Sequence, residues 1–472
     1  MWKGRFSQDV NEVVRRFTQS LDLDWRTVQA DIRGSIAHAR ALLRARLLTP
    51  GEASDIEREL VKIAGEAARG EFVPDESLED VHMNVESLLT SRLGDTGAKL
   101  HTGRSRNDQS ATSVRLALRD EIIGIGNMLA SLLETLLERA ARHIDVVVPG
   151  YTHLQQAQPI SMGQFWMAHF QAFSRDASRL LRAYESSDEC PLGCGALAGS
   201  TLPIDREFSA GDLGFSGISQ NSVDAVASRD HIVDFHHFAS LFGVHASRLS
   251  EDLIIYFSSE FGWVKLPDAF CTGSSMMPQK KNPDVLEIVR GKCGQLVGAH
   301  VDALVMLKGT PSSFDRDFQE DKRALWCSCD AVRAMLEVMP PLLANVEVDA
   351  ERAGRGFRDG FIFATDAAEH LVERGVPFRK SHEIVGGVVK WCIANNRSLT
   401  SLSPQEWRKF APQAGDELPS LLTPENSVSR RKTPGGTSPE QVRLQIDRGR
   451  KRTESLRSTL NNYRDKYPHM PE

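Results

Sequence analysis

Three short polar segments interrupt the long apolar patterns of this 472-residue chain, and they hold most of the side chains that can do chemistry. The first, residues 100–109, packs Arg104 and Arg106 among Thr, Ser and Asn directly before a long helical pattern. Arginine side chains and the free amides of a helix start bind carboxylates and phosphates. Spacing alone leaves two interpretations equally open: an anion site, or a solvated helix cap with a charge cluster.

The second segment, residues 149–159, places His153 after Thr152 in a loop bounded by prolines and rich in glutamine. Histidine exchanges a proton near neutral pH, which general acid–base catalysis requires. A lone histidine is more often structural than catalytic, but this irregular setting favours a catalytic role. Four other histidines share one long helical pattern and are interpreted as packing or surface residues: His231, His236, His237 and His245.

The third segment, residues 272–283, combines Gly273, Ser274 and Ser275 with Lys280 and Lys281. Glycine and proline make it an irregular loop. Two lysines near a serine supply the positive potential that stabilises an alkoxide or binds a substrate carboxylate. The alternative is a flexible basic surface loop, which the residue types and spacing alone favour slightly.

Helical periodicity dominates the elements that must position these segments. Between residues 112 and 145, apolar side chains recur in steps of three and four, which predicts one helix of about 34 residues. Four more long helical patterns cover residues 160–186, 228–261, 283–308 and 319–346. Helices this long need long partners, so the sequence predicts an all-α fold with a central bundle of five long helices.

Shorter helical patterns flank the predicted bundle, including residues 25–48 and 51–69. We therefore predict an N-terminal helical domain over residues 1–105, a central long-helix domain over 106–354 and a small C-terminal helical domain over 355–472. Within the last, residues 410–440 hold five prolines, which predicts loops rather than regular helix.

The first two polar segments flank the same predicted helix. At 1.5 Å per residue, about 34 residues span about 50 Å, so the segments lie at opposite ends of one subunit. If they serve a single site, antiparallel copies of the chain must bring them together. A symmetric homo-oligomer with composite sites follows from that condition.

Composition excludes several other classes of protein. Lys and Arg number 57 against 63 Asp and Glu, a net charge of −6, which argues against a nucleic-acid-binding surface. The sequence has no stretch of about 18 apolar residues, so we expect no membrane-spanning helix. The polar N-terminus lacks a signal-peptide core, so we expect a cytoplasmic protein. The seven cysteines form neither a disulfide framework nor a zinc-site spacing, so we expect thiols and no metal site.

The third segment also matches a known signature. Residues 273–282 fit the Gly-Ser-Ser-x-Met-Pro-x-Lys-x-Asn pattern of the fumarase/aspartase superfamily. Within that superfamily the chain resembles the argininosuccinate lyase and delta-crystallin family over essentially its whole length. The resemblance rests, in collinear order, on residues 2–6, 79–82, 102–109, 150–155, 191–193, 195–199, 319–322, 364–366, 375–379 and 435–437.

The resemblance implies a homotetramer whose long helices form one bundle, with each active site built from three subunits. It implies reversible elimination of fumarate from argininosuccinate, leaving arginine, as a step of arginine biosynthesis. It also implies that no metal or organic cofactor takes part.

By resemblance, Ser274 is the base at the carbon beside a substrate carboxylate, and His153 protonates the departing guanidinium nitrogen. The reverse assignment of base and acid stays open. Lys280 and the loop amides stabilise the developing charge together with Asn282, and Glu287 orients His153 across a subunit boundary. The remaining family binding positions fall on Ser20, Arg106, Asn107, Thr152, Phe314, Gln319 and Lys322.

Three positions depart from the family. Phe314 replaces a usual tyrosine, Gln156 a common basic residue and Ser113 a common aspartate. A lost hydroxyl removes one hydrogen bond, worth roughly 0.5–3 kcal/mol. These departures leave one alternative open, a related lyase that releases fumarate from another N-substituted aspartate. A crystallin-like structural homologue is a separate alternative, against which the intact Ser274, His153 and Lys280 argue.

Overall fold

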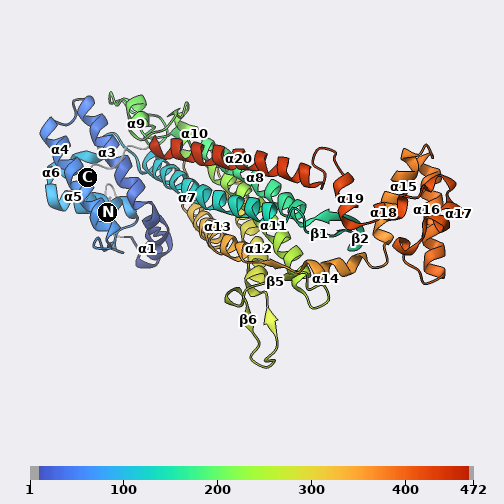
Figure 1. Ribbon diagram of the computed structural model, residues 1–472. Helices are drawn as coiled ribbons and strands as arrows, with labels where there is room; N and C mark the ends of the chain where they lie inside the picture. Colours follow the sequence, from blue (N-terminus) through green and yellow to red (C-terminus); the bar gives the residue numbers. More distant parts are fainter. Residues whose placement is uncertain (1–9, 467–472) are drawn as a thin grey trace.

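The computed structural model describes residues 10–466 and is built mainly from helices, with a few short strands (Figure 1). The predicted all-α class is confirmed. Residues 2–6, which contribute to the family resemblance, lie outside the described part of the chain. Among residues 10–466, none of the helices combines the length and apolar character needed to cross a membrane.

The N-terminal helices form one end of the molecule (Figure 1). They are α1 (Glu12–Thr18), α2 (Leu21–Asp24), η1 (Trp25–Thr27), α3 (Val28–Arg44), α4 (Pro50–Ala68), α5 (Val81–Leu93), α6 (Asp95–Ala98) and η2 (Lys99–His101). Their buried side chains make a hydrophobic cluster of their own, centred on α3, α4 and α5.

The middle of the molecule holds the predicted long helices, α7 (Arg106–Arg142), α8 (Met162–Ser186), α11 (Asp230–Phe257), α12 (Asp284–Leu307) and α13 (Asp321–Ala344). Short helices connect them: α9 (Arg206–Asp212), α10 (Ser222–Ala227), η3 (Asp268–Phe270) and η4 (Arg316–Gln319). The strands are β1 (Val147–Thr152), β2 (Gln155–Ser161), β3 (Glu189–Cys190), β4 (Gly217–Ile218), β5 (Val264–Lys265), β6 (Thr272–Gly273), β7 (Lys281–Asn282) and β8 (Glu347–Val348). They pair as β1–β2, β5–β8 and β6–β7 antiparallel and β3–β4 parallel.

The C-terminal helices are α14 (Ala350–Gly354), η5 (Arg355–Phe357), η6 (Phe361–Phe363), α15 (Ala364–Glu373), α16 (Phe378–Ala394), η7 (Leu399–Ser401), α17 (Pro404–Phe410), η8 (Pro412–Ala414), α18 (Leu418–Leu421), α19 (Pro424–Arg430) and α20 (Pro439–Asp465). Helices α15, α16, α17 and α18 lie beyond the β1–β2 hairpin at the other end, whereas α20 runs back along the bundle (Figure 1). A third hydrophobic cluster joins η6, α15 and α16 to residues as far as Leu422.

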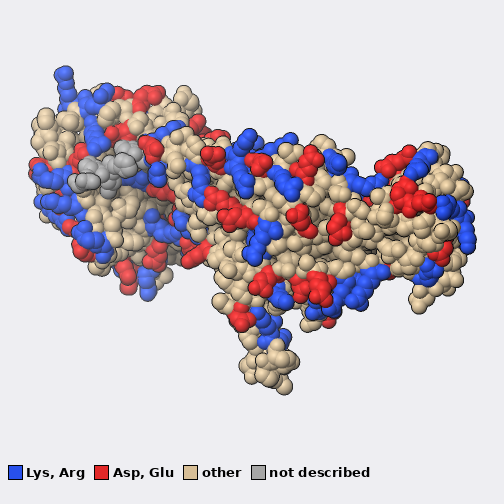
Figure 2. All heavy atoms as spheres, in the orientation of Figure 1, with Lys and Arg blue, Asp and Glu red and all other residues tan. Residues whose placement is uncertain are grey.

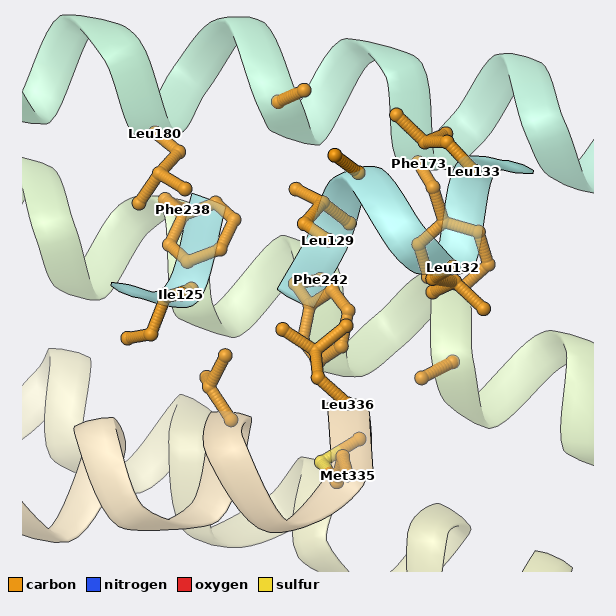
Figure 3. Close-up of a cluster of buried hydrophobic side chains, with 14 of the residues drawn as sticks. Ile125, Leu129, Leu132, Leu133, Phe173, Leu180, Phe238, Phe242, Met335 and Leu336 are labelled. Atoms are coloured by element: carbon orange, nitrogen blue, oxygen red, sulfur yellow. The ribbon is translucent and has the colours of Figure 1, made fainter. Parts of the chain in front are cut away.

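Helix α7 is the axis of the central core. It is 37 residues long, and α3, α8, α13 and α20 pack along it. Figure 3 shows part of this seam, with Ile125, Leu129, Leu132 and Leu133 of α7, Phe173 and Leu180 of α8, Phe238 and Phe242 of α11, and Met335 and Leu336 of α13. Each such side chain contributes about 1.5–3 kcal/mol on burial, so the seam holds α7 straight and in register.

Helix α7 begins at Arg106, six residues before the periodic pattern predicts, because a capping box starts it. Ser105 Oγ accepts a hydrogen bond from the backbone N–H of Asn107 at 3.2 Å, and the Ser105 N–H donates to Asp108 at 3.0 Å. Such caps satisfy amides that have no partner within the helix. The first polar segment thus includes the first turn of α7.

The C-terminal prediction needs two corrections. The proline-rich residues 410–440 contain short helices as well as loops, because Pro412, Pro419 and Pro424 occupy first turns, where a missing N–H is harmless. In addition, α20 is a sixth long helix that returns to the central bundle. Its residues Val442, Ile446, Leu456 and Leu460 join the core around α7 and α8, rather than the C-terminal cluster.

We predict that Gly449→Ala destabilises the protein, because Gly449 lets α20 approach the bundle closely. A Cβ there would lie 2.6 Å from Leu137 Cδ2 and 3.0 Å from the Phe170 ring. Overpacking of this kind costs about 1–3 kcal/mol. Thermal unfolding followed by circular dichroism measures the effect.

The matched control is Gly387→Ala in α16, where a Cβ meets nothing within 4 Å. Alanine stabilises a helix interior over glycine by roughly 0.5–1 kcal/mol, so this control should melt at the same temperature or higher. Equal melting temperatures for both variants would contradict the close packing of α20 on the bundle.

Candidate active site

A cavity of about 320 Å³ opens at the N-terminal end, between the N-terminal helices, the first turn of α7 and the start of α13. Six predicted binding residues line it although they span more than 300 positions of sequence: Ser20, Arg106, Asn107, Phe314, Gln319 and Lys322. The other lining residues are Asp24, Glu79, Asp80, His82, Met83, Ser110, Arg316 and Phe318. The structure therefore gathers one substantial polar site from segments that the sequence identified separately.

A buried charge cluster forms one wall of the cavity. Lys322 Nζ lies 3.0 Å from Asp321 and 3.4 Å from Asp24, and Ser20 Oγ donates a hydrogen bond to Asp24. Arg229 contacts the other oxygen of Asp321 at 2.5 Å. Burial lowers the pKa of the Lys322 ammonium, but Asp321 and Asp24 outweigh it and raise that pKa above its usual value. The cavity thus holds a fixed positive charge whose geometry is set by carboxylates.

Arg106 and Asn107 reach the cavity from the first turn of α7, where the helix dipole favours an anion. The Arg106 guanidinium donates to Glu86 and to Gln109, each at 2.7 Å. Burial raises the pKa of Glu86, but its hydrogen bond from His101 and the charge of Arg106 outweigh this and lower it to about 2. Glu86 is therefore ionised, and it fixes the direction in which Arg106 points.

Another buried network supports His82, which the sequence analysis did not single out. His82 Nδ1 lies 2.7 Å from Asp31, which also accepts hydrogen bonds from Gln109 at 2.8 Å and Ser113 at 3.3 Å. Burial lowers the pKa of His82, but the Asp31 carboxylate outweighs it and raises that pKa above normal. Ser113 adds a neutral donor beside Asp31.

Other acidic and basic residues of the cavity also escaped prediction. Arg316 forms an ion pair with Glu79 and donates to the Thr18 carbonyl at 3.0 Å. Glu79 and His82 lie in one segment of the family resemblance, which was the sequence signal that could have identified them. No sequence signal pointed to Asp24. Its role depends on Lys322, which lies nearly 300 residues away in sequence.

Phe314 supplies an apolar part of the cavity wall. Its ring centroid is 5.8 Å from that of Phe318, and its side chain packs on a small buried cluster of Cys194, Ala225 and Val226. An aromatic ring there presents no hydrogen-bonding group to a ligand.

His153 and Thr152 lie elsewhere, on the exposed tip of the β1–β2 hairpin. Thr152 pairs with Gln155, so His153 and Leu154 form a two-residue turn, and both have φ of +55°. Positive φ at both positions is the geometry of a tight hairpin turn, although it strains residues other than glycine. The predicted loop is thus a hairpin that presents His153 to its surroundings.

Ser274 lies at the base of the loop that projects between β6 and β7 (Figure 1). Its Oγ accepts hydrogen bonds from the backbone N–H groups of Met276 at 3.2 Å and Met277 at 3.0 Å. Figure 2 shows that the tip of this projection carries no charged side chain. The two amide donors are the kind of partner that stabilises a negative oxygen.

The remaining predicted catalytic residues accompany this loop. Lys280 is exposed, and the side-chain amide of Asn282 donates to the Gly273 carbonyl at 3.4 Å. Glu287 is exposed in the first turn of α12. Lys281, the neighbouring lysine, instead anchors the stem through an ion pair with Asp268 at 2.6 Å.

One chain does not bring these groups together. Helix α7 runs from the cavity to the β1–β2 hairpin, and its 37 residues at 1.5 Å each span about 55 Å. Figure 1 shows the β6–β7 loop projecting from the side of the bundle, away from both ends. The structure thus contains three separate groups: the cavity, the His153 hairpin and the Ser274 loop.

Neither pair of neighbouring cysteines forms a disulfide, since all seven thiols are free. Over the described part of the chain, no three His, Cys, Asp or Glu side chains come close enough to hold a metal ion.

Two family models match the chain: "Lyase" over residues 4–298 and "Argininosuccinate lyase C-terminal" over residues 361–429. An argininosuccinate lyase of Moorella thermoacetica is 46% identical over 461 residues, covering 98% of this chain and 99% of the relative. The argininosuccinate lyase of Desulforamulus reducens is 45% identical, covering 97% and 99%.

Solved structures agree on the fold. EDDS lyase in complex with formate superposes with a TM-score of 0.83 at 28% identity, covering 94% of this chain and 89% of that one. A class II fumarase from Schistosoma mansoni, 17% identical, has a TM-score of 0.73 and covers 88% and 92%, a likeness of fold alone. Both family models and the near full-length relatives agree, so the chain belongs to the argininosuccinate lyase family of carbon–nitrogen lyases.

Proposed function

We propose that the chain reversibly eliminates fumarate from argininosuccinate and leaves arginine. The observation that carries this proposal is 46% identity to a relative named argininosuccinate lyase, over 98% of the chain. An EDDS lyase variant solved with bound fumarate, 27% identical and with a TM-score of 0.82, supports the fumarate half.

The charges of the cavity suit a substrate with carboxylates at one end and a cationic group at the other. Lys322, Arg106 and Arg316 offer positive charge, while Asn107, Ser20 and Gln319 offer neutral hydrogen bonds. Asp24, Glu79 and Asp80 line the same cavity and suit an amine or guanidinium group. Because most of these charges are already paired, they keep their positions before the substrate arrives.

In the proposed first step, Ser274 removes a proton from the carbon beside a substrate carboxylate, which becomes a dianionic aci-carboxylate. A serine alkoxide needs strong stabilisation, and the amides of Met276 and Met277 already donate to this oxygen. Lys280 and Asn282, close by in the same loop, then hold the charge that develops on the substrate.

In the second step, the carbon–nitrogen bond breaks and its electron pair stays on the departing nitrogen, which His153 protonates. The exposed hairpin turn presents the imidazole for this role. Exchanging the roles, with His153 as base and Ser274 as acid, uses the same two residues. The pH dependence of kcat for each single variant separates the two assignments.

A homotetramer brings the three groups into one site in this proposal. Helix α12 supports it, since the helix leaves a row of apolar side chains exposed in the single chain: Ile288, Val297, Val301, Leu304 and Val305. Exposed apolar surface of this extent marks an interface. Glu287 lies on the same helix, where it can orient His153 of another copy.

We place this enzyme in the cytoplasm. Seven free thiols fit a reducing compartment. The face of the molecule in Figure 2 intersperses Lys and Arg with Asp and Glu, which does not favour a nucleic-acid partner.

We predict that Ser274→Ala lowers kcat for fumarate release by about 10²–10⁴-fold, the usual contribution of general acid–base catalysis. The oligomer should stay intact because Ser274 is in an exposed loop. Ultraviolet absorbance of fumarate measures turnover, and sedimentation measures assembly. Ser275→Ala is the neighbouring-serine control and should lower kcat less. A kcat for Ser274→Ala close to the wild-type value would show that Ser274 takes no part in the mechanism.

We predict that mixing Ser274→Ala subunits with His153→Asn subunits restores activity, because each site takes these residues from different copies. With random assembly, about one site in four carries both intact residues. The measurement compares verified mixed tetramers with each inactive parent. Mixed tetramers without recovered activity would place both residues in the same copy, against the composite site.

The Phe314 ring favours a second candidate function, release of fumarate from another N-substituted aspartate. If argininosuccinate is the substrate, Phe314→Tyr should lower its KM by about 2–10-fold at unchanged kcat, since Phe314 lines the cavity and a hydroxyl added there offers the substrate one hydrogen bond. Steady-state kinetics on a panel of N-substituted aspartates tests this. A higher kcat/KM for another panel member would select the second candidate.

A further inference from the structure

The hairpin that carries His153 rests on two segments that the proposed mechanism does not use. One is the loop of residues 258–263 after α11, and the other is the α14–η5 segment. Together we name them the hairpin cradle, defined by Phe261, Gly262, Trp263, Arg352 and Gly356. None of these residues lines the substrate cavity.

Aromatic packing holds one side of the hairpin. Tyr151 lies two residues before His153, and its ring centroid is 5.6 Å from that of Phe261 and 5.7 Å from that of Trp263. Phe261 and Trp263 pack edge to face on each other at 5.2 Å. Since a ring packed on two others has little freedom to move, strand β1 is fixed just before the turn.

Gly356 closes the other side. A Cβ at this position would lie 2.7 Å from Pro149 Cγ and 2.8 Å from Gln156 Nε2, one residue on each strand of the hairpin. Gln156 pairs with Tyr151 across the ladder and donates to its hydroxyl at 3.4 Å. The hairpin therefore packs closely against the backbone of η5, and a methyl group at Gly356 would force Pro149 and Gln156 to shift.

Arg352 fastens the two cradle segments together. Its Nε donates to the Phe261 carbonyl at 3.0 Å, and its terminal nitrogen donates to the carbonyl of Ser259. The guanidinium also covers Gly262, whose φ is +58° and where a Cβ would lie 2.4 Å from the guanidinium carbon. The backbone of Asp349 adds a hydrogen bond to the Trp263 carbonyl at 2.7 Å.

We infer that Gly356 and Arg352 are positioning residues for His153: through the hairpin cradle they fix where the tip of the hairpin stands. This inference rests on the proposed function, in which His153 transfers a proton. The tip itself is exposed in the chain and strained at two residues, so its position depends on support from below. A proton donor must lie within hydrogen-bond reach, and a shift of about 1 Å costs about 10²-fold in rate.

The test compares Gly356→Ala with Gly354→Ala, two alanines placed two residues apart. Gly356→Ala should lower kcat by about 10–100-fold with little change in KM, because the substrate cavity lies at the far end of α7. At Gly354 a Cβ meets nothing within 4 Å, so that control should keep wild-type kinetics. Both variants should keep the wild-type assembly; overpacking should lower the melting temperature of Gly356→Ala, whereas that of Gly354→Ala should stay the same or rise.

Mixed tetramers locate the defect. Gly356→Ala subunits mixed with Ser274→Ala subunits should gain activity, because some sites combine a sound hairpin with an intact serine. Mixed with His153→Asn subunits they should gain none, since both defects lie in the hairpin contribution. Gain with both partners, or with neither, would overturn the inference.

A double variant tests whether removing one of the close contacts restores activity. Gln156→Ala removes one of the two groups that an alanine at Gly356 meets, so it should recover part of the lost kcat in the Gly356→Ala background. If Gly356→Ala does not fold, Arg352→Lys replaces it: this change keeps the charge and removes the double contact to two carbonyls. It should give the same kcat loss and the same pattern in mixed tetramers.

Failure of the inference and failure of the proposed function are distinguishable. An active wild type whose Gly356→Ala variant matches Gly354→Ala would overturn the inference alone. A wild type that releases no fumarate from argininosuccinate would overturn the proposed function, and the inference with it.

Discussion

The continuous apolar seam of α7 is the constraint on which the rest of the structure depends. Leu129, Leu132 and Leu136 are fully buried along it, so the helix cannot bend or break without opening the core. Its two ends therefore stand about 55 Å apart, at 1.5 Å for each of 37 residues. The cavity that begins at Arg106 and the hairpin that follows Arg142 cannot meet within one chain, so in our proposal copies of the chain share the site.

Ion pairs with neighbouring carboxylates also fix the positions of the charged side chains around the cavity. Asp321 and Asp24 hold Lys322, Glu86 holds Arg106, and Asp31 holds His82, each at hydrogen-bonding or ion-pairing distance. Buried ion pairs contribute little net stability, because removing charges from water costs about as much as pairing returns. In the proposed mechanism, donors and charges then stand ready before the reaction begins, which is where electrostatic catalysis gains most. The exposed Ser274 loop and His153 hairpin complete the same arrangement from other copies in our proposal.

The long helices were predictable because their signal is local. An apolar side chain every three or four residues indicates the buried face of α7, whichever helices pack against that face. The return of α20 was not predictable, since Val442 and Ile446 show only that the helix has an apolar face, and not which core receives it. The same holds for Asp24 and Asp31, whose importance comes from partners far away in sequence. Short strands such as β1, interrupted by Pro149 and a bulge at Gly150, carry too few residues for an alternating pattern. Ser274 and His153 were identified by motif and loop context, and their catalytic roles stay predictions.

In our proposal, no single chain contains a complete active site. The most direct measurement follows specific activity through a dilution series while analytical ultracentrifugation records the oligomeric state of the same samples. Fumarate release from argininosuccinate should fall in step with the fraction of tetramer, and the monomer should be inactive. A folded monomer that keeps its specific activity would show that one chain holds a complete site.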